Sequence, residues 1–284
     1  MGLVWPRLGR LLSLAASTFA VCLAGGDVGA QGRLEAKYTV TLAGLPIGKG
    51  SWVVEIGDDQ YAATVTGATA GLIKIFTSGR GAGIARGLVR GDNLLPTAYV
   101  STVANDTRME EVRIALNAGA VKDLVVEPPP MPNPDRVPVT DAHRRGVLDP
   151  MTAALVRVPG NGELITPEVC RRTLPIFDGR MRFDLHLSFK RFEQVVTEKG
   201  YRGPVAVCGV QFTPLAGHVP DRPAIKYLMA ERDMEIWMAP IAGTRVMAPY
   251  HISLRTPLGQ GVLEATQFVS TPGPSGAPPA TAAR

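Results

Sequence analysis

Cysteine and histidine are scarce in this chain of 284 residues, which contains three cysteines and four histidines. The histidines, His143, His186, His218 and His251, are far apart, and neither His-Glu-x-x-His nor Cys-x-x-Cys occurs. Closely spaced ligands of that kind are typical of zinc sites. Because they are absent, we expect no metal site and no cofactor.

Familiar catalytic motifs are also missing. There is no Gly-x-Ser-x-Gly nucleophile motif, and the glycine-rich stretch GRGAGIARG (79–87) has Ile84 where Gly-x-Gly-x-x-Gly requires its third glycine. We interpret these glycines as marks of a bent strand or a β-bulge. The chain is therefore expected to be non-catalytic. The alternative is a hydrolase or wall-modifying enzyme with an unrecognised site.

Charge of one sign does not dominate. The chain has 30 Lys and Arg against 25 Asp and Glu, a net charge of +5, and only 6% aromatic residues. A nucleic-acid groove usually needs clustered basic residues with aromatic side chains among them. No such cluster occurs, so we expect no nucleic-acid partner.

Long hydrophobic runs are limited to one short segment near the beginning. Arg7 and Arg10 precede the apolar run 11–23, and the small residues 28–30 follow it. This order is typical of a secretory signal peptide, and the run is short for a membrane span. We predict a signal peptide over residues 1–30 and a periplasmic protein. A retained signal anchor is the alternative.

Removal of this segment would also remove Cys22 and leave Cys170 and Cys208. An even pair of cysteines in an exported chain is first interpreted as a disulfide. A catalytic cysteine paired with a histidine is the alternative. Closing a loop of this length stabilises a fold by about 4 kcal/mol on the chain-entropy model.

The dominant hydrophobic period is two, which is typical of β-strands with one buried face. Alternating segments include 33–44, 79–89, 97–103, 109–116 and 120–127, and turn residues such as Gly57-Asp58-Asp59-Gln60 separate them. The pattern predicts a mainly β, antiparallel domain over residues 31–270.

Three segments depart from this period. Residues 127–138 contain six prolines and are expected to be an extended connector. Asp149 and Pro150 are a typical helix start, and the spacing predicts one helix over residues 149–158. Residues 271–284 are rich in Pro, Gly and Ala and are expected to be a disordered tail.

Three motifs together resemble a known family: VLDPMTAALVRV (147–158), CRRTLPIFDGRMRFDL (170–185) and VCGVQFTPLAGH (207–218). The chain is similar to the bacterial exported domain-of-unknown-function family 3108 over about residues 38–268. The resemblance implies one strongly curved antiparallel sheet, or incomplete barrel, around a helix, similar to lipoprotein-carrier and periplasmic β-spiral folds. It implies no particular activity.

Such a curved sheet can enclose an apolar pocket. Large side chains expected on inward strand faces are Trp52, Phe183, Phe189 and Trp237, which are either ligand contacts or ordinary core. We expect a cell-envelope protein that binds or scaffolds an apolar ligand, a lipid or a lipoprotein. A purely structural role through envelope partner proteins is a further alternative.

Overall fold

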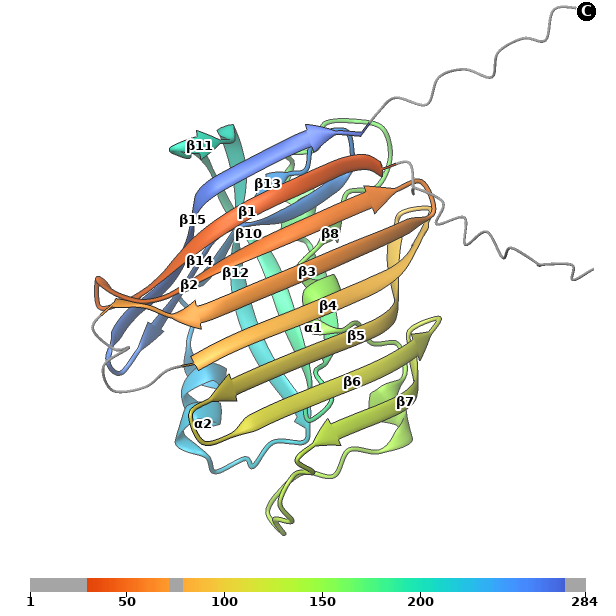
Figure 1. Ribbon diagram of the computed structural model, residues 1–284, viewed down its shortest axis with the longest axis vertical. Coiled ribbons are helices and arrows are strands. Elements are labelled where there is room, and N and C mark those ends of the chain that lie inside the picture. Colours follow the sequence, from red (N-terminus) through yellow and green to blue (C-terminus); the bar gives the residue numbers. More distant parts are fainter. Residues whose placement is uncertain (1–29, 72–78, 274–284) are drawn as a thin grey trace, which may run out of the picture.

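The structure is a computed structural model that describes residues 30–71 and 79–273 (Figure 1). The predicted signal peptide, apart from Ala30, lies outside the described residues, as do residues 274–284 of the predicted tail. Most of GLIKIF (71–76), which could also be interpreted as a single helical turn, lies outside them as well. No helix in the described part of the chain is long and apolar enough to cross a membrane.

The described residues form 15 strands in one sheet. The strands are β1 (Ala30–Leu42), β2 (Leu45–Gly57), β3 (Gln60–Thr69), β4 (Gly79–Arg90), β5 (Asn93–Asn105), β6 (Met109–Asn117), β7 (Ala120–Glu127), β8 (Val156–Arg157), β9 (Arg172–Phe177), β10 (Arg182–Val196), β11 (Lys199–Gly200), β12 (Arg202–Ala216), β13 (Met234–Pro240), β14 (Val246–Thr256) and β15 (Gly259–Pro272). The helical elements are η2 (Asp141–Arg144), α1 (Pro150–Ala153), η3 (Pro167–Cys170) and α2 (Pro223–Ala230).

The sheet is one open meander in which the first and last strands, β1 and β15, are neighbours in the middle. Its order is β7-β6-β5-β4-β3-β2-β1-β15-β14-β13-β12-β10-β9, so β1 pairs with β2 on one side and with β15 on the other. The predicted antiparallel, mainly β architecture is confirmed. The short β11 is an exception, because it runs parallel to β15. Figure 1 shows β1–β7 in front and β10 and β12 crossing behind them.

Two hydrophobic clusters stabilise the sheet. The main cluster draws buried side chains from both halves of the chain, including Leu34, Ile56 and Phe268, each 0% exposed. The second cluster joins residues 156–170 to the strands around β12. Burial of these side chains is the dominant favourable contribution to folding.

The predicted disulfide is present in the second cluster. Cys170 at the end of η3 and Cys208 in β12 are bonded, their Cα atoms lie 5.2 Å apart, and both are 0% exposed. The bond fixes the segment containing η3 against β12. Cys170 is therefore a structural half-cystine in this fold and not a free thiol.

The helix predicted over residues 149–158 is only partly correct. Asp149 caps α1 as expected, and its Oδ1 accepts hydrogen bonds from the backbone N–H groups of Met151 and Thr152 at 2.9 and 3.0 Å. The helix ends after one turn, because Val156 and Arg157 pair with β14 as strand β8. Tertiary strand pairing overrides the local helical pattern here.

Helix α2 is a second correction, since its residues fall in a segment interpreted as a strand. Pro223 occupies the first turn, where its missing N–H costs nothing. The Lys226 ammonium lies 2.7 Å from the Asp221 carboxylate just before the helix. Residues 128–138 of the expected connector contain no helix or strand, whereas Glu127 belongs to β7, and β15 extends to Pro272, so the predicted tail begins too early.

Candidate functional site: an apolar cavity above a glycine surface

Glycines occupy the inward-facing positions at one end of three neighbouring strands. In β3 exposure alternates strictly: Thr64, Thr66 and Ala68 are exposed, whereas Val65 and Gly67 are half-buried. In β4 the exposed Arg80 and Ala82 alternate with less exposed glycines in the same way. The inward glycines are Gly48 and Gly50 in β2, Gly67 in β3, and Gly79, Gly81 and Gly83 in β4.

Strand register places these glycines beside one another. Gly50 pairs with Gly67, and Gly67 pairs with Gly81, so one row of three glycines crosses the sheet. In the next row Trp52, Val65 and Gly83 are opposite one another. A sheet surface without side chains leaves empty space above it. We call the six inward glycines, Gly48, Gly50, Gly67, Gly79, Gly81 and Gly83, the glycine surface.

The space above the glycine surface differs from one position to the next. A Cβ atom added at Gly67 would meet only Lys49 O within 4 Å, at 3.6 Å, and one at Gly81 would meet Thr102 O at 3.6 Å and Val103 Cγ2 at 3.9 Å. These are ordinary contacts. At Gly83 an added Cβ would lie 3.0 Å from Met151 Sδ. Gly83 is therefore required for the close approach of α1, whereas Gly67 and Gly81 face open space.

A cavity of about 690 Å³ lies over this surface. Its walls come from β1, β5, α1, β14 and β15, and they include Tyr38, Tyr99, Met151, Ile252 and Leu263. The volume is within the range of about 300–1,000 Å³ that is usual for small-molecule sites. The lining is predominantly aliphatic and aromatic, which suits an apolar ligand.

The polar groups of the buried wall differ, because Trp52 Nε1 is buried without a hydrogen-bond partner in the described structure, whereas the Tyr38 hydroxyl is satisfied within the fold. Tyr38 donates its hydroxyl hydrogen to the backbone oxygen of Pro249 at 2.7 Å, which links β1 to β14 across the sheet. Burial raises the pKa of the Tyr38 phenol well above its usual range. Tyr38 is therefore a neutral donor and contributes no charge to the cavity.

Helix α1 is held over the glycine surface by a buried polar chain. Thr152 donates its hydroxyl hydrogen to Asp149 Oδ2 at 2.5 Å, and its oxygen lies 2.7 Å from the Tyr61 hydroxyl. Burial raises the pKa of Asp149, although hydrogen bonds from Thr152 and Met151 oppose the shift. These groups position α1 and are not directed at a ligand by any contact in the described structure.

Of the four side chains proposed as ligand contacts, Trp52 lines the cavity, and the other three are not among its lining residues. Phe183 packs on Phe212 with ring centroids 5.4 Å apart, and Phe189 packs on Phe192 at 4.8 Å. Phe183 and Phe189 are on β10 and Trp237 is on β13, in the half of the sheet where η3 and β8 add a second layer. The shared inward face assumed for all four is therefore not found at the cavity.

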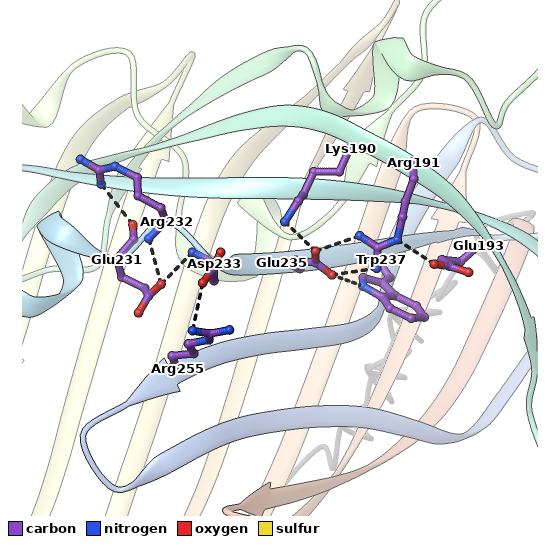
Figure 2. A network of polar contacts seen from close by, with 9 residues as sticks. All are labelled: Lys190, Arg191, Glu193, Glu231, Arg232, Asp233, Glu235, Trp237 and Arg255. Carbon is purple, nitrogen blue, oxygen red and sulfur yellow. Dashed lines mark hydrogen bonds and ion pairs between the residues drawn. The ribbon is translucent and has the colours of Figure 1, made fainter.

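Trp237 instead belongs to a polar network shown in Figure 2. The Arg191 guanidinium stacks 5.6 Å from the centre of the Trp237 ring and donates to both carboxylate oxygens of Glu235, at 2.9 and 3.2 Å. Lys190 lies 2.7 Å from the same carboxylate.

These contacts determine the charge of Glu235. Hydrogen bonds from Arg191, together with Lys190 and the Trp237 N–H, lower the pKa of Glu235 to about 2 despite partial burial. Glu235 is therefore ionised at neutral pH and cannot act there as a proton donor. Among the described residues, no group of three or more His, Cys, Asp or Glu could hold a metal ion.

The sequence contained an overlooked signal for the cavity. Glycines recur at every second position in 48–50 and 79–83, and Gly67 lies between these segments in an adjacent strand. We attributed the GRGAGIARG glycines to a bend or bulge. The structure places a register shift at Arg86/Gly87, so the bulge is confirmed at Gly87, whereas Gly79, Gly81 and Gly83 lie in regular pairing. A glycine at every second residue removes the side chains from one face of a strand.

The fold and cavity together define an open, curved antiparallel β-sheet protein with an apolar internal site. The family model described as "Protein of unknown function (DUF3108)" matches residues 37–266, and the chain belongs to this family. No curated protein matches.

Among solved structures, the chain is similar to the crystal structure of a beta-barrel-like protein of domain of unknown function DUF1849 from Brucella abortus. That similarity has 9% sequence identity and a TM-score of 0.45, and it covers 85% of this chain and 99% of the other.

Proposed function

We propose that this protein is an exported, periplasmic, non-catalytic binding protein for an apolar, lipid-like ligand. The observation that carries the proposal is the glycine surface, which leaves a cavity of about 690 Å³ with an aliphatic and aromatic lining. A cavity of this kind gains binding free energy chiefly by removing apolar ligand surface from water.

The chemistry of the lining supports binding over catalysis. Among the described lining residues there is no carboxylate, histidine or cysteine, so no carboxylate or imidazole base is there to activate the lining serines and no thiol nucleophile is present. The perturbed acid beside the cavity, Asp149, already accepts three hydrogen bonds from α1. Export is supported by the buried Cys170–Cys208 disulfide, because such bonds persist in oxidising compartments.

The proposal is tested by native mass spectrometry of the protein purified from the periplasm without detergent. We expect a retained apolar ligand, or uptake of the uncharged apolar dye N-phenyl-1-naphthylamine by the emptied protein. Trp52 lies in the cavity wall and should report occupancy through a change in its fluorescence. A protein that carries no ligand and takes up neither the dye nor fatty acids would contradict the proposal.

A further inference from the structure

Several large apolar side chains are exposed around the open end of the cavity. Val103 and Ile252 line the cavity and are 59% and 37% exposed, so solvent reaches the cavity at these two residues. Beyond this opening, Leu45 and Leu258 are 63% and 77% exposed, and Met109 is 63% exposed. We call Leu45, Val103, Met109, Ile252 and Leu258 the apolar rim.

Four of the five residues of the apolar rim lie at or near the tips of three hairpins, and Ile252 lies within β14. Leu45 follows the β1–β2 turn and Leu258 lies in the β14–β15 turn, and these turns touch, since Ala43 N donates to Gln260 O at 2.9 Å. Val103 and Met109 flank the β5–β6 turn. All three turns lie along the left edge in Figure 1. Exposed apolar side chains on separate hairpin tips along one edge fit a flat partner surface better than they fit a single peptide bound in a groove.

The charged residues that line the cavity beside the rim are basic, although acidic residues such as Glu110 and Asp233 lie near the hairpin tips. Lys49 and Arg80 are the charged residues among the described lining residues, and both side chains are exposed. Neither makes an ion pair with another described residue. Arg255, next to the β14–β15 turn, is 67% exposed in its side chain but already lies 3.3 Å from the Asp233 carboxylate. Basic residues near an anionic bilayer favour association, and exposed leucines add apolar burial in its interface.

We propose that the apolar rim docks the open end of the cavity on a bilayer with anionic phospholipid headgroups. This inference rests on the proposed function, because it supplies the route by which an apolar ligand enters without crossing water. Leu45 and Leu258 enter the interface, while Lys49 and Arg80 contact headgroup phosphates. The partner is therefore an anionic membrane surface, and the ligand is exchanged at that surface.

The test is flotation of the full mature protein with vesicles of phosphatidylethanolamine and phosphatidylglycerol, or of phosphatidylcholine alone. We expect the native protein to float with the anionic vesicles and Leu45→Asp/Leu258→Asp to lose about tenfold in partitioning. Lys49→Gln/Arg80→Gln should lose partitioning to anionic vesicles and show the same low partitioning as native on neutral ones. Val196→Asp is the matched control.

Val196 is 65% exposed on β10, close to β11, which pairs with β15 at Gln267 and Phe268, far along the strand from Leu258. Each variant is also titrated with N-phenyl-1-naphthylamine. Leu45→Asp/Leu258→Asp should keep native dye affinity, because neither leucine lines the cavity. A native protein that binds dye but ignores both vesicles would overturn docking alone. Equal loss in Val196→Asp, or vesicle binding that is indifferent to lipid charge, would also overturn it.

Discussion

Filling the cavity from its glycine surface should separate ligand binding from stability. The perturbation is Gly67→Leu/Gly81→Leu, which adds eight side-chain carbons above β3 and β4. Neither glycine has a positive φ, and an added Cβ meets ordinary contacts of 3.6 Å or longer at both positions. The backbone therefore accepts leucine without strain at these two sites.

The expected change in stability is favourable or neutral. Glycine within a strand costs roughly 0.5–1 kcal/mol relative to alanine, and the new side chains bury apolar surface against the cavity wall. We expect the free energy of unfolding to rise by about 1 kcal/mol for each site. The two positions pair directly across β3 and β4, so the sum is not strictly additive.

The expected change in binding is unfavourable and large. Eight carbons occupy the room of about eight ligand methylenes, each worth about 0.8 kcal/mol when buried. Even a quarter of that loss, about 1.6 kcal/mol, weakens binding more than tenfold. The assay is titration with N-phenyl-1-naphthylamine, accompanied by urea unfolding of each variant.

Two control variants test whether the effects come from filling the cavity. Gly162→Leu places the same side chain at an exposed position with no atom within 4 Å of the added Cβ, and it should change neither quantity. Gly83→Leu meets Met151 Sδ at 3.0 Å and should destabilise by about 1–3 kcal/mol. If the double variant binds the dye with native affinity, the cavity is not the site. If the double variant is strongly destabilised, the space above Gly67 and Gly81 is not open.

Three further predictions concern stability. Cys170→Ser/Cys208→Ser should lower the free energy of unfolding by about 4 kcal/mol, since the bond closes a loop of 38 residues, and a thiol assay on the unreduced native protein should detect no reactive thiol. Asp149 has a raised pKa in the fold, so its contribution to stability is present at low pH and falls as pH rises from about 4; denaturant titrations should show this slope in the native protein and not in Asp149→Asn. The pKa of Glu235 is shifted in the opposite direction, down to about 2. Its contribution to the stability of the fold is therefore complete above about pH 4.5 and is lost as pH falls towards 2. Because Arg191 is partly exposed, we expect only about 1 kcal/mol from this pair, absent in Glu235→Gln; a native acid-unfolding curve that coincides with that of Glu235→Gln would contradict the assignment.

The strands of the first half were predictable because one of their faces is buried and the other is not. β7 has the predicted bounds, Ala120–Glu127, and the turn at Asp58 and Asp59 joins β2 to β3 as expected. Period-two alternation with Gly, Asp and Asn at the breaks depends only on local sequence. The disulfide was also predictable, because removal of the predicted signal peptide would leave two cysteines, which allow a single pairing.

The helices were less predictable, because their extent depends on distant partners. The segment 223–230 contains a nearly continuous apolar run that fits a strand or a helix equally well. The helix that begins at Asp149 stops early because Val158 N donates to Arg245 O at 2.8 Å, across 87 residues of sequence. Neither the helical state of 223–230 nor the pairing of Val158 with Arg245 can be inferred from residue spacing along the chain.

The cavity also has a physical explanation in the division of the sheet into two unlike halves. In β12 five consecutive residues, 205–209, are buried, because the second cluster covers the face opposite the main cluster. In β3 and β4 burial alternates, and the inward positions near the cavity are glycines. The C-terminal half therefore has two packed faces and a disulfide, and it contributes stability that the hollow N-terminal end does not. A protein that needed its glycine surface for packing would lose stability at Gly67 and Gly81. A protein that keeps its glycine surface for a ligand can gain stability at positions 67 and 81 only by filling the space that the ligand would occupy.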